Sequence, residues 1–177
     1  MLEQLTAARN HYLEGYAKAV QNRQDHTPEV GMQVGDDAPE PYNLYRFDLV
    51  SFDGDEPSLV EVNLESYIES EPMIYQVGDM AVEIQSLHWN GIEFSVQPAI
   101  VDEEPLKVWA IRWLDLEEDL DLGGFIHSLT APEDDRGYTM WSVDFGTAPV
   151  QAVQELLQVL AGLGVKSVKL HSETMID

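Results

Sequence analysis

Hydrophobic residues recur at steps of three or four over the first 24 residues, and this spacing predicts an amphipathic helix. The stripe consists of Leu2, Leu5, Ala8, Tyr12, Tyr16 and Val20. Residues 25–41 contain three prolines and two glycines without any hydrophobic period, so we expect a long loop there. The chain therefore begins with a helix that is separated from the next regular element.

From residue 42 to 145 the pattern is mainly that of β-strands. Hydrophobic and polar residues alternate from Tyr42, and again from about Leu59, where Glu61, Asn63 and Glu65 fall on the polar face. Strands are also predicted at 80–89 and 92–100, joined as a hairpin by the Asn90-Gly91 pair. Residues 107–113 alternate Trp and Ile with other residues, which we interpret as a central strand covered on both faces.

The C-terminal part, residues 138–171, has the size and pattern of a β-α-β unit. A strand at 138–145 precedes a helix from Pro149 to about Leu163, for which Thr147 is the expected N-cap and Gly164 the left-handed C-cap. A strand at 165–170 follows, and we expect it to run parallel to the first. The sequence thus predicts one α+β domain, residues 1–177, with a mixed, mainly antiparallel sheet, an N-terminal helix and a C-terminal β-α-β unit.

The charge of the chain is far from balanced. It has 33 acidic and 9 basic residues, a formal net charge of −24, together with 44% hydrophobic residues that can form a core. No Lys or Arg occurs between Arg46 and Lys107, nor between Arg112 and Arg136, although both intervals contain many acids. Such a field repels phosphate and anionic lipid, so we expect no direct nucleic-acid binding and no membrane binding.

The usual motifs of enzymes and metal sites are missing from the sequence. Cysteine is absent, which excludes disulfides and thiolate chemistry, and no nucleophile elbow, P-loop or dinucleotide fingerprint occurs. The Asp144-Phe145-Gly146 tripeptide lacks the other kinase motifs and indicates only a strand-to-helix turn. We therefore expect no cofactor, no metal and no enzymatic activity, although a dispersed site using His88 or His127 stays open. No secretory signal or membrane segment is apparent, which favours the cytoplasm.

Acidic and aromatic residues that alternate in two segments are suited to capture a basic protein surface. The predicted partner-binding residues are Glu61, Glu65, Tyr67, Glu69 and Glu71 in the first segment, and Asp115, Glu117, Glu118, Asp119 and Asp121 in the second. Toxins that attack nucleic acids are basic around their active sites, so the leading hypothesis is an immunity-type inhibitor of such a toxin.

Three alternatives remain open from the sequence. The chain could be an acidic secretion-type chaperone or adaptor that forms a homodimer and masks a basic client. It could be an enzyme with a site assembled from distant residues. The acidity could also reflect general solvation of the surface, as in salt-adapted proteomes, and then carry no information about a partner.

Overall fold

The structure is a computed structural model that describes residues 1–21, 26–35, 37–51, 58–62 and 71–172. Its described elements are three helices, α1 (Leu2–Gln21), α2 (Glu104–Leu114) and α3 (Val150–Gly162), and ten strands. The strands are β1 (Thr27–Gln33), β2 (Leu44–Ser51), β3 (Ser58–Val60), β4 (Met73–Val77), β5 (Met80–Ile84), β6 (Ile92–Gln97), β7 (Ser128–Leu129), β8 (Glu133–Asp135), β9 (Tyr138–Asp144) and β10 (Ser167–His171). The prediction of an α+β fold is confirmed.

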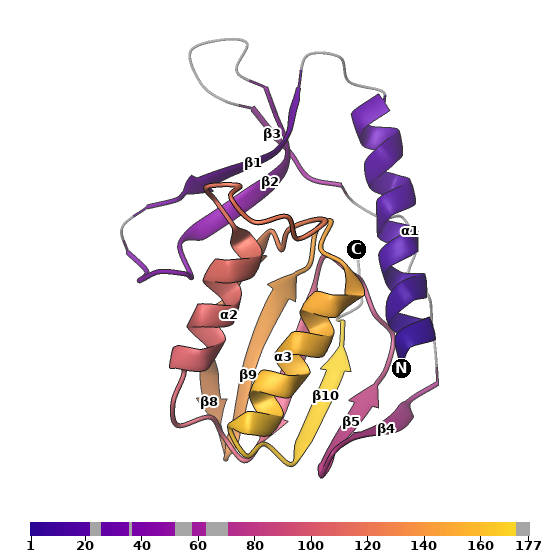
Figure 1. The fold of residues 1–177 in the computed structure, drawn as a ribbon, viewed down its shortest axis with the longest axis vertical. Coiled ribbons are helices and arrows are strands. Elements are labelled where there is room, and N and C mark those ends of the chain that lie inside the picture. The colour runs from indigo at the N-terminus through magenta and orange to yellow at the C-terminus, as the bar shows by residue number, and fades with distance from the viewer. Residues whose placement is uncertain (22–25, 36, 52–57, 63–70, 173–177) are drawn as a thin grey trace.

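The strands form two sheets. The larger sheet has the order β4-β5-β10-β6-β9-β7, with β8 also paired to β9, and the smaller antiparallel sheet has the order β1-β2-β3. Among the paired strands, β5 and β10 are parallel and the others are antiparallel, so the predicted mixed, mainly antiparallel arrangement is confirmed. The smaller sheet projects beyond one end of the larger one, and α2 and α3 cover one face of the larger sheet (Figure 1).

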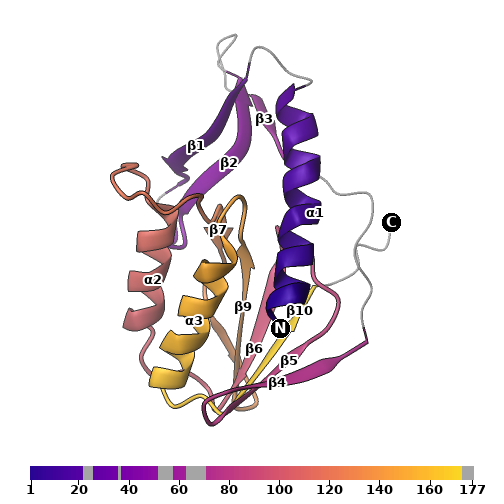
Figure 2. The same ribbon diagram turned by 45° about the vertical axis from the view of Figure 1, so that its right-hand side comes forward.

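Helix α1 runs alongside both sheets (Figure 2). Its stripe is buried at Leu5, Ala8 and Tyr12, as its spacing predicts. Near its N-terminus, the hydroxyl of Tyr75 in β4 donates to Gln4 Oε1 at 2.9 Å. Two turns further on, the Tyr12 hydroxyl donates to Asp48 in β2. The helix therefore connects the outer strand of the larger sheet to the middle strand of the smaller sheet.

The C-terminal unit has the predicted elements but a split arrangement. β9 and β10 run in the same direction, yet β6 lies between them and is antiparallel to both. Helix α3 ends before Gly164, whose φ of +81° confirms the predicted left-handed position. The predicted N-cap is wrong: Pro149 takes that position without a side-chain cap, and Thr147 bonds elsewhere.

Two further predicted elements, at residues 25–41 and 107–113, are wrong. Residues 25–41 are not all loop, because β1 pairs with β2 over Thr27–Gln33; Pro28 is tolerated there because β1 is an edge strand. The predicted strand at 107–113 lies in helix α2, within the region that we expected to be mainly β. Its buried residues, Leu106, Trp109, Ala110, Trp113 and Leu114, follow helical spacing.

The predicted hairpin around Asn90-Gly91 is also wrong. Strand β5 ends at Ile84, and β10 is inserted between β5 and β6, so the strands on either side of this pair are not neighbours. The pair lies in a turn in which the Gly91 N–H donates to His88 O at 3.1 Å, and neither residue has a positive φ. The tight hairpin of this region joins β4 and β5 at Gly78, whose φ is +60°.

Candidate functional site

A buried ionic cluster joins the two sheets, and its centre is the ring of His127. Glu29 in β1 and Asp48 in β2 stand opposite each other, because Pro28 pairs with Leu49 and Val30 with Phe47. Two carboxylates at facing positions repel each other unless a cation lies between them. The imidazole of His127 provides that cation: Nδ1 lies 3.1 Å from Asp48 Oδ1 and Nε2 lies 3.3 Å from Glu29 Oε1.

Both ring nitrogens of His127 therefore face carboxylates, which requires the doubly protonated imidazolium. Burial by itself would lower the pKa of His127, but hydrogen bonds to Asp48 and Glu29, with the nearby charge of Asp144, raise it to about 10. The pKa of Asp48 is lowered despite its burial, because it is bonded by His127, Tyr12 and the Val62 N–H. The two carboxylates therefore favour the charged form of this histidine, which makes it a poor general base.

The cluster extends to the polypeptide backbone on both sides. The His127 N–H donates to Asp144 O at 2.8 Å, and His127 O accepts from the Arg46 N–H at 2.7 Å. Thr147 donates from its hydroxyl to Glu29. Since Asp144 is in β9 and Arg46 in β2, His127 connects the larger sheet to the smaller one through both its side chain and its main chain.

Only 2% of His127 and 4% of Asp48 are exposed to solvent, so a substrate cannot reach either side chain in this conformation. Burial raises the pKa of Asp144 to about 7, a value that would suit a general acid or base. Neither of the two cavities described below includes this residue. The other histidine considered above, His88, is in the turn before β6, where its N–H donates to Ser172 Oγ at 2.8 Å. We interpret the cluster as a structural joint.

The predicted partner-binding residues are only partly described. Glu65, Tyr67 and Glu69 lie outside the described residues. Glu61, Glu71, Glu117, Glu118, Asp119 and Asp121 are exposed, as a contact surface requires. Asp115 is 5% exposed, and its carboxylate accepts hydrogen bonds from the N–H groups of Asp119 and Leu120. Asp115 therefore shapes the loop that carries Glu117, Glu118, Asp119 and Asp121, and it is too buried to belong to the predicted contact surface.

Side chains of strand β2 form hydrogen bonds to the backbone next to both predicted acidic segments, at residues 114–115 and at residue 62. The guanidinium of Arg46, whose side chain is fully buried, donates to Leu114 O at 2.5 Å and to Asp115 O, and pairs with Glu118 at 3.1 Å. Two residues later, Asp48 Oδ2 accepts from the Val62 N–H at 2.6 Å, next to Glu61. Glu71 is elsewhere, just before β4 at the edge of the larger sheet.

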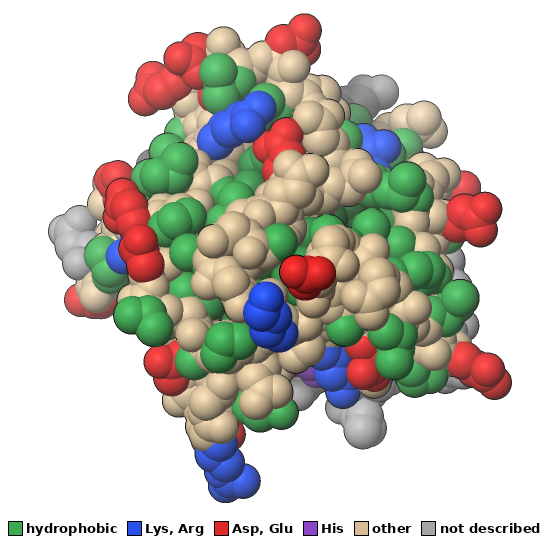
Figure 3. Space-filling model, turned by 60° about the horizontal axis from the view of Figure 1, so that its bottom comes forward, with side chains coloured by type: hydrophobic (Ala, Val, Ile, Leu, Met, Phe, Trp, Pro, Cys, Tyr) green, Lys and Arg blue, Asp and Glu red, His purple; other side chains and the backbone are tan. Residues whose placement is uncertain are grey.

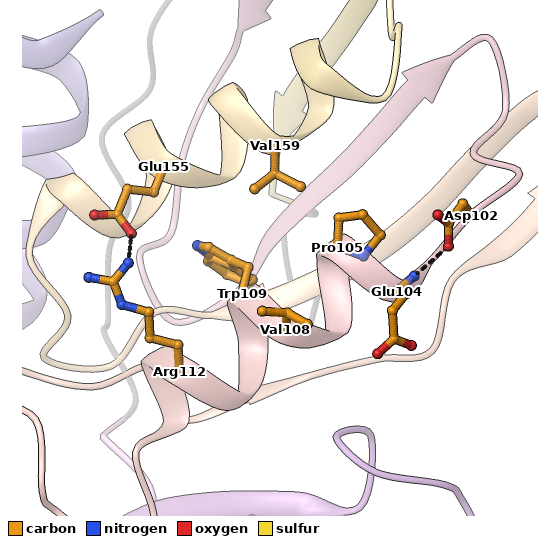
Figure 4. A pocket seen from close by; sticks show the side chains of 8 residues that line it. All are labelled: Asp102, Glu104, Pro105, Val108, Trp109, Arg112, Glu155 and Val159. Carbon is orange, nitrogen blue, oxygen red and sulfur yellow. Dashed lines mark hydrogen bonds and ion pairs between the residues drawn. The ribbon is translucent and has the colours of Figure 1, made fainter.

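A groove between α2 and α3 was not predicted from the sequence, because it depends on α2 being a helix. Its volume is about 420 Å³. The lining residues are Asp102, Glu104, Pro105, Val108, Trp109, Arg112, Glu155 and Val159 (Figure 4).

A second, smaller cavity of about 280 Å³ is bordered by Glu93, Thr130 and Trp141, among others. Within the described residues, no group of three or more His, Asp or Glu side chains is placed to hold a metal ion.

At least one face of the molecule has no continuous acidic patch. On the face in Figure 3, where the bottom of the molecule in Figure 1 comes forward, acidic side chains stand singly or in small groups that hydrophobic and neutral surface separates. Along the described part of the chain, no helix is long and apolar enough to cross a membrane.

Fold and site together define a two-sheet α+β protein with an acidic surface, a closed ionic joint and an open groove between two helices. Comparisons of this chain with protein-family models, with curated proteins and with solved structures found no match.

Proposed function

We propose that this chain is a non-enzymatic acidic binding protein that neutralises a basic protein effector, as an immunity-type inhibitor does. The observation that carries the proposal is the strongly negative net charge of −24, which comes from 33 acidic and 9 basic residues. A net charge of −24 attracts cationic proteins over distances comparable to the Debye length, which is about 10 Å at 0.1 M salt.

Among the described residues, five basic side chains contact polar groups of the chain itself. Arg9 donates to the carbonyl oxygens of Ala148 and Thr147 at 2.8 and 3.0 Å, and Arg46 is buried. Lys107, Arg112 and Arg136 pair with acids at 3.6, 3.1 and 3.6 Å. Each of these ion pairs neutralises one carboxylate, so the excess of negative charge that a partner would meet comes from the carboxylates left unpaired by the few bases.

The contact surface that we propose is the acidic loop, defined as Glu117, Glu118, Asp119 and Asp121, together with Glu61. Arg46 and the buried Asp115 hold the backbone of the loop in one shape. A preorganised set of charges loses less entropy on binding than a flexible one, which favours specificity as well as rapid association.

The class of partner follows from charge. An effector that binds nucleic acid carries cations around its active site, and an acidic protein that covers this site blocks access to phosphate. The His127 cluster gives no support to catalysis, since it is closed to solvent and explained by its role between the sheets.

Affinity capture with the purified chain, in native extract at low and high salt and with the neighbouring gene product added, tests this proposal. We expect a basic protein at low salt and much less at high salt. The purified partner should then lose its nucleic-acid-degrading activity on addition of one equivalent of the chain. Neutralising Glu117, Asp119 and Asp121 should weaken this inhibition more than neutralising the exposed Glu3, Glu14 and Asp79.

Other outcomes would contradict the proposal. Hydrolysis of a substrate by the chain alone, with no basic partner recovered, would identify an enzyme. A stable homodimer that binds a basic client without inhibiting any activity would identify a chaperone or adaptor. Equal effects of the two triple variants would mean that only total charge matters.

A further inference from the structure

The groove between α2 and α3 has an apolar floor between two different polar ends (Figure 4). Pro105, Val108, Trp109 and Val159 form the middle. The Trp109 indole N–H donates to Ala152 O at 3.1 Å, which fixes its ring against α3. Since only 4% of Trp109 is exposed, the ring is a rigid base of the groove and not a mobile side chain.

The end of the groove at Arg112 is neutral and internally bonded. Arg112 pairs with Glu155 at 3.1 Å, and the same carboxylate oxygen accepts from the Trp113 indole N–H at 3.1 Å. Its other oxygen accepts from Gln151 at 2.8 Å. The charges of Arg112 and Glu155 balance each other at this end, so it limits the groove without a net charge that would attract a charged ligand.

The opposite end is negative. Asp102 accepts the Glu104 N–H at 3.0 Å, which positions its carboxylate at the first turn of α2. Asp102 and Glu104 are the charged lining residues at this end, and the one basic lining residue, Arg112, is at the other. A ligand in the groove thus meets apolar surface and two negative charges side by side.

The outer rim of the groove exposes hydrophobic side chains. Val108, which lines the groove, is 59% exposed. Val101 is the chain neighbour of the lining residue Asp102 and is completely exposed. Apolar surface of this kind beside a cavity is typical of a site that is covered in a complex. A second copy of this chain is not favoured as the partner that covers the groove, because two copies that each carry a net charge of −24 repel each other.

We infer that this groove binds an amphipathic segment of the cationic protein partner, with an aliphatic side chain on Trp109 and Val159 and a Lys or Arg at Asp102 and Glu104. The inference rests on the proposed function and deepens it, because it assigns apolar contact energy to a partner that charge attracts. Burial of one aliphatic side chain contributes energy that long-range attraction does not.

Fluorescence anisotropy with synthetic peptides and the full chain tests the inference. The probe is a helix-forming peptide of about 15 residues, with leucines at i and i+4 and lysines beside them. One control peptide replaces the leucines by alanine, and another replaces the lysines by glutamine. We expect the leucine–lysine peptide to bind roughly tenfold more tightly than the alanine control, as burial of an aliphatic side chain predicts. It should also bind more tightly than the glutamine control, because that peptide has no cation to place at Asp102 and Glu104.

Matched variants locate the site. Val108→Asn should weaken binding of the leucine–lysine peptide by roughly tenfold, whereas Ile111→Asn, on the same helix but outside the groove, should change it little. Asp102→Asn with Glu104→Gln should weaken it more than Glu117→Gln with Asp119→Asn. Both Asn variants replace exposed residues, and circular dichroism would verify that they fold.

The outcomes separate this inference from the proposed function. Equal binding of the leucine and alanine peptides, or equal effects of Val108→Asn and Ile111→Asn, would overturn the groove as the site even if the chain still neutralises a basic effector. If the glutamine peptide bound as tightly as the leucine–lysine peptide, the inference that the ligand is cationic would be wrong. Specific peptide binding with no inhibition of any effector would support the groove and contradict the proposed function.

Discussion

His127 is the residue on which the joint between the sheets depends, because it is the cation between Glu29 and Asp48. Replacing one member of a buried ionic cluster leaves the others uncompensated, which costs about 3–5 kcal/mol. We expect His127→Asn to lower the free energy of unfolding by about this amount in urea denaturation. His171→Asn is the matched control, since His171 pairs with Glu93 near the surface and should matter by less than about 1 kcal/mol.

The same residue predicts a pH dependence. The pKa of His127 is about 10 in the folded chain and about 6.5 when unfolded, so the folded state holds the proton more tightly. The stabilisation is fully present below pH 6.5 and is lost as the pH rises through 10. Urea midpoints of the wild-type chain should therefore fall between pH 6.5 and 9.5, and those of His127→Asn should fall less. If the urea midpoints of the wild type and of His127→Asn fell equally with pH, the stabilising role assigned to the imidazolium would be wrong.

Gly146 is constrained by its neighbour as well as by its backbone. Its φ is +44°, and a Cβ added there would lie 2.1 Å from His127 Cδ2. Gly78 has a φ of +60° but open space around it. We expect Gly78→Ala to cost about 1–2 kcal/mol from backbone strain alone. Gly146→Ala should cost clearly more in the same urea assay, and equal losses would mean that His127 moves aside freely.

At the scale of elements, strand β2 organises the acidic loop that follows α2. Arg46 of β2 donates to Leu114 O, Asp115 O and the Glu29 O of β1, and its guanidinium stacks on Phe125 with its central carbon 3.9 Å from the ring centre. A planar group with several donors can make these contacts together, and a lysine ammonium cannot. The conformation of the acidic loop thus depends on the buried side chain of Arg46 as well as on that of Asp115.

We expect Arg46→Lys to loosen the loop without unfolding the two helices behind it. Amide hydrogen exchange of residues 115–120 should become faster, while exchange within α3 should change little, because local and global opening differ in free energy. Glu118→Gln is the control: the Glu118 side chain is 63% exposed, so removing its charge should leave the exchange pattern nearly unchanged. Uniform acceleration in all elements would indicate global destabilisation instead.

At the scale of the whole molecule, the net charge opposes folding while it favours binding. Repulsion among the carboxylates destabilises the compact state, and salt screens this repulsion. We expect Tm to rise between 10 mM and 150 mM NaCl, by about 2–4 °C for each kcal/mol that screening recovers. Scanning calorimetry measures this, and the neutralised Glu117, Asp119 and Asp121 variant should show a smaller rise.

Association with the basic partner should respond to salt in the opposite sense. Screening weakens the attraction between unlike charges, so the association rate constant should fall over the same range of salt. Stopped-flow association with the recovered partner would measure it. A chain that becomes more stable in salt but binds no cationic protein at any ionic strength would fit general surface solvation and contradict the proposed function.

The sequence alone determined the features that depend on local periodicity and local turn chemistry. The stripe through Leu5, Ala8 and Tyr12 predicted α1, and Gly164 marked the end of α3, because these signals lie within a few residues of each other. The strands β2 and β9 and the α+β fold followed from the same kind of pattern. Helix α2 could also have been found, since Pro105 in its first turn and the helical spacing from Leu106 to Leu114 outweigh the alternating tryptophans.

Only the tertiary structure decided which distant segments meet. The insertion of β10 between β5 and β6 separates residues that the Asn90-Gly91 pattern placed side by side, because strand pairing reflects burial of the whole sheet and not one turn. The cluster of Glu29, Asp48 and His127 joins positions up to 98 residues apart, and the groove needs two helices packed together. Charge and hydrophobicity are properties of composition, whereas a site requires their placement, and that placement is set by long-range packing.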